Sequence, residues 1–131
     1  MPTVTSAHMN LVLAWLWITV GVVVGFVLGA YFHRDDWLGG YTSFKRRLYR
    51  LAHVAFFGLA IINLLFYFTV QRLASPGTII NLASWAFAIG AVTMPACCFL
   101  MAHNSRLRAI FLIPVLSTLG GACITLWEVL R

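Results

Sequence analysis

Long apolar runs alternate with short polar connectors along the chain, and this pattern predicts four membrane-spanning helices. The runs cover residues 11–32, 51–70, 79–102 and 107–130. Each is close to the ~20 residues that an α-helix needs to cross the hydrocarbon core of a bilayer. Short connectors make consecutive spans antiparallel neighbours. The sequence therefore predicts an all-α fold, an integral membrane four-helix transmembrane bundle of up-down topology, with one domain over residues 1–131.

The longest polar segment, residues 33–50, is predicted to be a water-exposed connector between the first two spans. Its Gly39-Gly40 pair favours a turn, and Ser43 is placed to act as the N-cap of the second helix. Seven of the nine basic residues lie in this connector or around the one between the third and fourth spans. The positive-inside rule then places both connectors in the cytoplasm and both termini on the non-cytoplasmic side of the cell inner membrane.

Composition supports the membrane assignment and narrows the choice of partners. The chain is 62% hydrophobic and 9% charged, and its mean hydropathy is +0.93, which is outside the range of soluble domains. The net charge of +6 does not indicate nucleic acid, because basic residues beside apolar runs are typical of loops that face anionic lipid headgroups. We expect such headgroups at the cytoplasmic face to bind Lys45, Arg46, Arg47 and Arg50.

A row of glycines in the first span predicts close helix packing. Gly21, Gly25 and Gly29 recur every fourth residue, so they share one face of the helix. Small residues at this spacing let two backbones approach each other, which is a main source of helix association in lipid. The second helix can lie within the same bundle or belong to another subunit. Contact within the bundle is favoured, and the hypothesis to be tested is that the row contacts a partner subunit.

Three histidines are placed by the predicted topology at the same cytoplasmic boundary: His33, His53 and His103. Imidazole can ligate haem iron or a transition metal, and neighbouring arginines can pair with haem propionates. No helix carries two histidines at ligand spacing, however, so interfacial or hydrogen-bonding roles are favoured. We predict no metal site and no cofactor; haem b bound by a pair of these histidines is the alternative.

Two prolines lie inside predicted spans. Pro95 and Pro114 have no backbone N–H, so the carbonyls of Ala91 and Ile110 lose their helical partners. Asn63 of the second span lies near the same depth, and we expect it to donate to one of these carbonyls. Four tryptophans are expected in an aromatic belt at the non-cytoplasmic side: Trp15, Trp17, Trp85 and Trp127.

The sequence does not indicate an enzyme. It has no nucleophile elbow, zinc-protease motif or phosphate-binding glycine loop. The span interiors contain no Asp, Lys or Arg, and the only carboxylate in a span is Glu128, near its outer end. An ion-coupled transporter normally needs an ionisable group near the midplane.

The remaining interpretation is a non-catalytic protein that acts by binding other membrane proteins. Residues 46–67, RRLYRLAHVAFFGLAIINLLFY, resemble small bacterial four-span proteins, a resemblance that implies no activity. The sequence favours a non-catalytic accessory or structural subunit of a larger bacterial membrane complex, of the respiratory or photosynthetic electron-transfer kind, with other membrane-protein subunits as partners. The first alternative is a small b-type cytochrome or a haem- or quinone-binding electron-transfer subunit. The second is a small channel or transporter.

Overall fold

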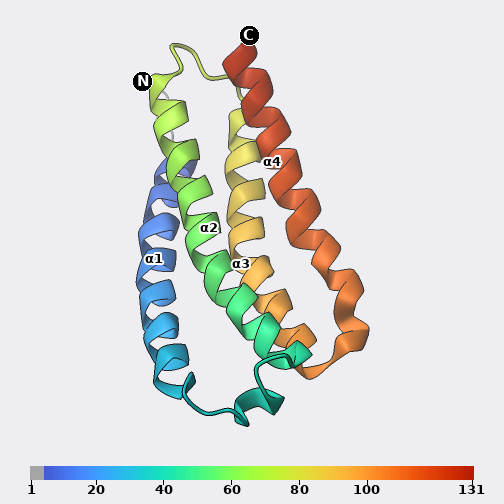
Figure 1. Cartoon of the computed structure of the whole chain (residues 1–131). Coiled ribbons are helices and arrows are strands. Elements are labelled where there is room, and N and C mark those ends of the chain that lie inside the picture. Colours follow the sequence, from blue (N-terminus) through green and yellow to red (C-terminus); the bar gives the residue numbers. More distant parts are fainter. Residues whose placement is uncertain (1–4) are drawn as a thin grey trace.

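The computed structural model describes residues 5–131, which fold into four long helices joined by short connectors (Figure 1). The long helices are α1 (Thr5–Tyr31), α2 (Phe44–Arg72), α3 (Ile80–His103) and α4 (Leu112–Leu130). Two short 3₁₀ helices, η1 (Trp37–Gly39) and η2 (Ser105–Phe111), lie in the connectors. Four helical segments are long and apolar enough to cross a membrane. The predicted all-α architecture with four membrane-compatible helices is confirmed.

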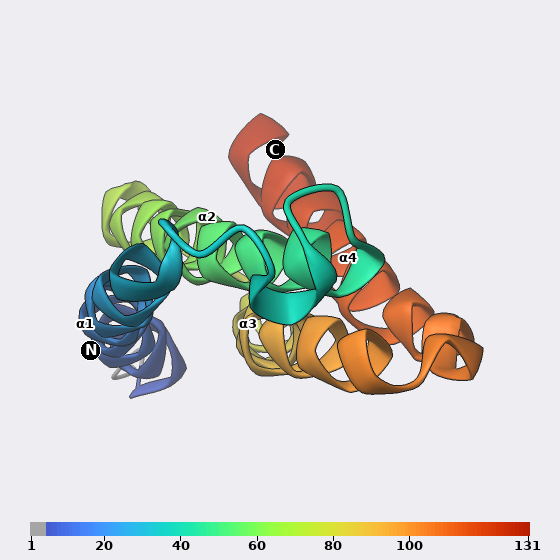
Figure 2. The ribbon, with the colours of Figure 1, turned by 60° about the horizontal axis from the view of Figure 1, so that its bottom comes forward.

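The two middle helices form the centre of the bundle, and the outer helices lie on opposite sides of them (Figure 2). α1 packs mainly on α2, whereas α4 packs mainly on α3. Consecutive helices run in opposite directions, so the start of α1 and the end of α4 lie at one end of the bundle and η1 and η2 lie at the other (Figure 1). The bundle is therefore open, with α1 and α4 each packed along one side only.

Local signals in the sequence determine where α2 begins. Gly39 and Gly40 have φ angles of 84° and 97°, a backbone region that glycine enters without steric cost. The hydroxyl of Ser43 accepts a hydrogen bond from the backbone N–H of Arg46 at 3.1 Å, and it donates to the carbonyl of Leu38 at 2.6 Å. The predicted turn and the predicted N-cap are both present.

Helix ends differ from the limits of the apolar runs at both ends of the chain. α1 begins at Thr5 rather than at residue 11, because the more polar residues before the apolar run are helical as well. The fourth span does not begin as an α-helix at residue 107, because residues 105–111 form the 3₁₀ helix η2. Pro114 is consequently the third residue of α4, where its missing N–H has no helical acceptor to lose.

Small side chains determine how closely the helices pack. A buried cluster near the chain ends combines alanines with larger apolar residues: Ala7, Phe66, Val70, Ile80, Ala83 and Phe87. Between α3 and α4, Gly121 lies against the Phe87 ring, and a Cβ added at this glycine would be 3.1 Å from that ring. The Ser117 hydroxyl donates to the carbonyl of Ala86 at 2.6 Å. The α3–α4 pair therefore rests on close contact and on hydrogen bonds across the helices, as expected for association in lipid.

Candidate functional site

Three fully buried polar side chains connect α1, α2 and α3: Asn10, Asn63 and Ser84. The amide nitrogen of Asn10 donates to Asn63 Oδ1 at 2.6 Å and to the backbone carbonyl of Ser84 at 3.1 Å. The Ser84 hydroxyl lies within hydrogen-bonding distance of Asn10 Oδ1 and of the Ser6 carbonyl. We call Asn10, Asn63 and Ser84 the amide network. Burying these groups costs little because each one is hydrogen-bonded.

The two carbonyls expected to lose their helical partners, those of Ala91 and Ile110, do not pair with Asn63, and only Pro95 lies well inside an α-helix. Asn63 donates to Leu59 O of its own helix at 2.8 Å, because its oxygen is turned toward Asn10. The indole N–H of Trp17 donates to Ala91 O at 2.7 Å instead. The Cys97 thiol lies 3.6 Å from Ile110 O. Trp17 is thus an interhelical donor rather than a belt residue, whereas the other three predicted belt tryptophans are exposed: Trp15, Trp85 and Trp127.

The glycine row divides into two parts. A Cβ at Gly21 would lie 2.9 Å from the Phe57 ring, and one at Gly25 would lie 2.6 Å from His53 Nε2. Both of these glycines therefore pack against α2 within the chain. A Cβ at Gly29 would have nothing within 4 Å. Only the end of the row near the connector is left open.

The structure gives the three histidines different surroundings. His53 packs between the backbone of α1 at Gly25 and the ring of Phe57, with ring centroids 5.3 Å apart. His103 is exposed, and its Nδ1 lies 2.9 Å from Phe99 O, one turn earlier in α3. His33 is exposed in the turn after α1. Among residues 5–131, no three His, Cys, Asp or Glu side chains come together in an arrangement that could hold a metal ion.

One of the four basic residues expected at lipid headgroups is buried inside the connector. Arg46 is 2% exposed, and its guanidinium donates to the carbonyls of Phe32 at 3.0 Å and Arg34 at 3.3 Å. Its Cζ also lies 5.1–5.6 Å from three aromatic ring centroids, those of Phe32, Trp37 and Tyr41. Arg46 therefore holds the connector against α2 and does not face the headgroups. The other three basic residues retain access to the surface: Lys45, Arg47 and Arg50.

The single carboxylate in a span is already paired. Glu128 is 4% exposed, and its Oε2 lies 3.1 Å from Arg131 Nε and accepts the backbone N–H of Gly77 at 3.1 Å. Arg131 in turn donates to the carbonyl of Ser75 at 3.1 Å. These contacts clip the α2–α3 loop to the end of α4. Glu128 thus serves this loop, at the end of the bundle away from the connector.

Cavities at the surface of the bundle offer further places where another molecule can bind. An apolar groove of about 600 Å³ runs between α1 and α3, with Val12, Leu16, Trp85 and Ile89 among its walls. We call it the α1–α3 groove. A second cavity contains Arg106 and Arg108 at the connector end. Sequence reasoning counted these arginines only as topology signals, because nothing in the local pattern shows which helices they face.

Fold and contacts together define a four-span bundle of the multi-pass membrane class, whose helices are joined by neutral hydrogen bonds. Comparison with family models, with curated proteins and with solved structures finds no match for this chain.

Proposed function

We propose that the protein is a non-catalytic accessory subunit of a larger membrane complex, of the bacterial energy-converting kind, in the inner membrane. The observation that carries this proposal is how the buried polar side chains are used. The amide network joins three helices, Trp17 joins α1 to α3, and Glu128 fixes the loop between α2 and α3. Because these polar side chains stabilise helix packing, they favour a structural role, in which the protein supports a complex through its contacts.

The α1–α3 groove is the surface that we assign to the partner. It is lined by apolar side chains apart from Thr93, and two membrane-crossing helices form its walls. In lipid, helices associate through close packing rather than through removal of apolar surface from water. A concave surface offers more such contact than a convex helix, so one transmembrane helix of a partner subunit is the occupant that we propose.

A tryptophan placed in the α1–α3 groove is expected to release the partner. Val12 is 55% exposed and lines the groove, whereas Val22 of the same helix is 59% exposed and does not. Val12→Trp should therefore fill the groove without disturbing the core, and Val22→Trp is the matched control. We expect tagged wild type and Val22→Trp to retain the same partner subunits after detergent extraction from native membranes, and Val12→Trp to lose most of them, as measured by quantitative mass spectrometry. Equal recovery with both variants would contradict the assignment of this groove.

For the orientation in the membrane, we propose that both connectors face the cytoplasm and both termini the other side. Six basic residues other than the buried Arg46 support this orientation, since they lie before η1, in the first two turns of α2 or in η2, all at the connector end of the bundle: Arg34, Lys45, Arg47, Arg50, Arg106 and Arg108. A cysteine at the exposed Thr42 should escape a membrane-impermeant maleimide added to intact cells and should react after lysis. The protein without this substitution measures labelling of the three native cysteines. Labelling of Thr42→Cys in intact cells would reverse the orientation.

A further inference from the structure

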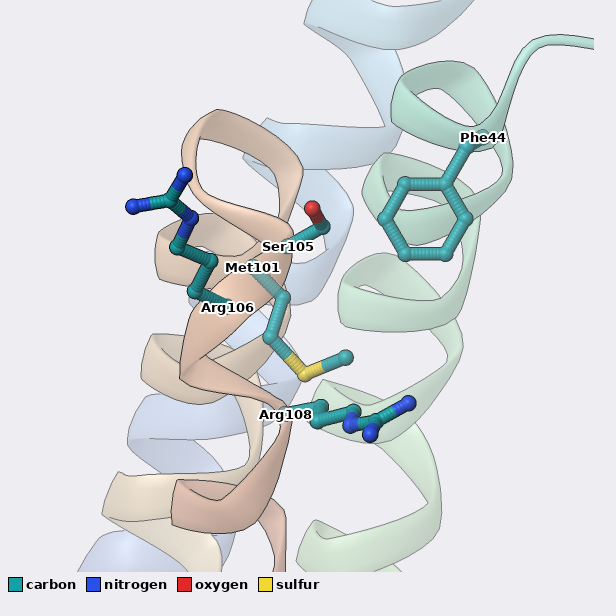
Figure 3. A pocket seen from close by; sticks show the side chains of 5 residues that line it. All are labelled: Phe44, Met101, Ser105, Arg106 and Arg108. Atoms are coloured by element: carbon teal, nitrogen blue, oxygen red, sulfur yellow. The ribbon is translucent and has the colours of Figure 1, made fainter.

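A cationic pocket of about 630 Å³ lies at the connector end, between the start of α2 and the junction of α3 with η2 (Figure 3). Phe44, Met101 and Ser105 line it together with two arginines. Figure 3 shows Arg108 extending from η2 toward α2, while Arg106 points outward. The backbone N–H of Arg106 is fixed by Asn104 Oδ1 at 3.1 Å, so the 3₁₀ turn that carries both arginines is anchored at its start.

Both guanidinium groups are available for a ligand. Arg106 and Arg108 are exposed, and the one ion pair within residues 5–131 joins Glu128 and Arg131 at the far end of the bundle. Arg47 adds a third positive charge nearby, because it lies one turn from Phe44 on the same face of α2 and is exposed. The pocket thus concentrates positive charge at the depth where a bilayer has its headgroups.

A separate apolar groove of about 410 Å³ lies deeper in the bundle, with Leu51, Met94 and Val115 in its walls. Each of these residues lies seven positions deeper than a residue of the pocket: Phe44 and Leu51 on α2, Met101 and Met94 on α3, Arg108 and Val115 on η2 and α4. On α2 and α3, seven residues are nearly two helical turns, so the same faces of these two helices line both cavities, about 10 Å apart in depth. A third cavity shares Ile62 with this groove and extends along α2 and α4 toward the chain ends.

We propose that the pocket and the groove together form a binding site for one anionic phospholipid. The phosphate binds Arg108, which extends across the pocket toward α2, and Arg106 adds positive charge at its outer edge. An acyl chain lies in the groove between α2 and α4. Charge complementarity selects the headgroup, since guanidinium donors bind phosphate oxygens with charge-assisted hydrogen bonds. The apolar walls of the groove bind the acyl chain, because they lie in the hydrocarbon region on the open side of the bundle. This inference does not depend on the proposed partner, whose groove lies between α1 and α3.

The charge requirement is tested on delipidated full-length protein in detergent by native mass spectrometry. The probes are dioleoyl-phosphatidylglycerol and dioleoyl-phosphatidylcholine. We expect the wild type to prefer phosphatidylglycerol. The double variant Arg106→Gln/Arg108→Gln should bind it roughly thirtyfold more weakly, since each arginine near a lipid surface contributes about one kcal/mol. Arg72→Gln is the control, because Arg72 is an exposed arginine at the other end of α2.

The groove requirement is tested by two glycines that both have room for a side chain. A Cβ at Gly58, which lines the groove, would meet nothing within 4 Å, and the same is true at Gly29 on α1. Gly58→Leu should therefore fill the groove without forcing helices apart, and Gly29→Leu should match it in bulk and in lipid exposure. We expect Gly58→Leu to weaken phosphatidylglycerol binding severalfold and Gly29→Leu to leave it unchanged.

Each other outcome overturns the proposal in a defined way. Equal affinity for the two lipids, or no change in the double arginine variant, would show that the cationic pocket does not select a headgroup. Loss of binding in the arginine variant but not in Gly58→Leu would reduce the site to a surface for phosphate. Competition by glycerol phosphate as effective as competition by the lipid would lead to the same conclusion.

Discussion

Replacing Asn10 by alanine is expected to lower the free energy of unfolding by about 2–3 kcal/mol, because it leaves the buried oxygen of Asn63 without its donor and the Ser84 hydroxyl with the Ser6 carbonyl alone. Within the amide network, the side chain of Asn10 alone contacts both of the other helices. In membrane proteins a single interhelical hydrogen bond contributes about 0.6 kcal/mol on average. The larger effect expected here comes from the unpaired groups that remain.

Unfolding by SDS in mixed micelles, followed by circular dichroism, measures this change. Asn81→Ala is the matched control, since Asn81 is an exposed amide whose oxygen accepts from the Ser6 hydroxyl at 2.5 Å. Its loss should change the unfolding free energy by no more than about 0.5 kcal/mol, as is usual for surface positions. Similar effects from the two alanines would mean that the amide network does not stabilise the bundle.

Gly21→Leu is the second substitution expected to destabilise the fold strongly, by about 1–3 kcal/mol, which is the range for overpacked contacts. The added Cβ would lie 2.9 Å from the Phe57 ring and 3.3 Å from Phe56 Cβ. Phe56 is itself fixed by an edge-to-face contact with Trp17, with ring centroids 5.5 Å apart. The Phe57 ring can turn aside, but the Phe56 Cβ is fixed to the backbone of α2, so a leucine here pushes α1 away from α2 and the interhelical dispersion contacts weaken together.

The same SDS titration tests this expectation. Gly29→Leu has the same change in volume on the same helix but no neighbour within 4 Å, so its unfolding free energy should stay near that of the wild type. A destabilised Gly21→Leu whose surviving fraction still binds partners would separate internal packing from subunit contact. If Gly29→Leu is the more damaging of the two, then α1 packs on α2 in a different rotation from the one described here.

Hydropathy and local signals were sufficient to predict the four helices and the start of α2. Each apolar run reports directly on the length of a membrane span, and Ser43 with Gly39-Gly40 marks a boundary through interactions a few residues apart. The amide network could not be predicted in this way. Asn10 lies just outside the first apolar run, and its pairing with Asn63 depends on the rotation of α1 about its axis. α1 and α3 are apolar on all sides, so their patterns do not determine that rotation.

The burial of Arg46 in the connector could not be predicted from the sequence pattern either. Arg46 and Arg47 are adjacent and equivalent as sequence, yet one is buried against three aromatic rings and the other is exposed. The difference follows from the path of residues 32–41, which the pattern of polar residues does not encode. The cationic pocket has a similar origin, since it combines Phe44 with arginines more than sixty positions later.

All side chains of the amide network belong to the first three helices, and this has a consequence for how the chain is made. Synthesis proceeds from the N-terminus, and early segments begin to fold before later ones are complete. The contacts among Asn10, Asn63 and Ser84 require nothing from α4. Three spans can therefore assemble in the bilayer while the fourth is still inside the ribosome. α4 then packs on helices that are already assembled, and a chain that fails at this last step is a target for degradation.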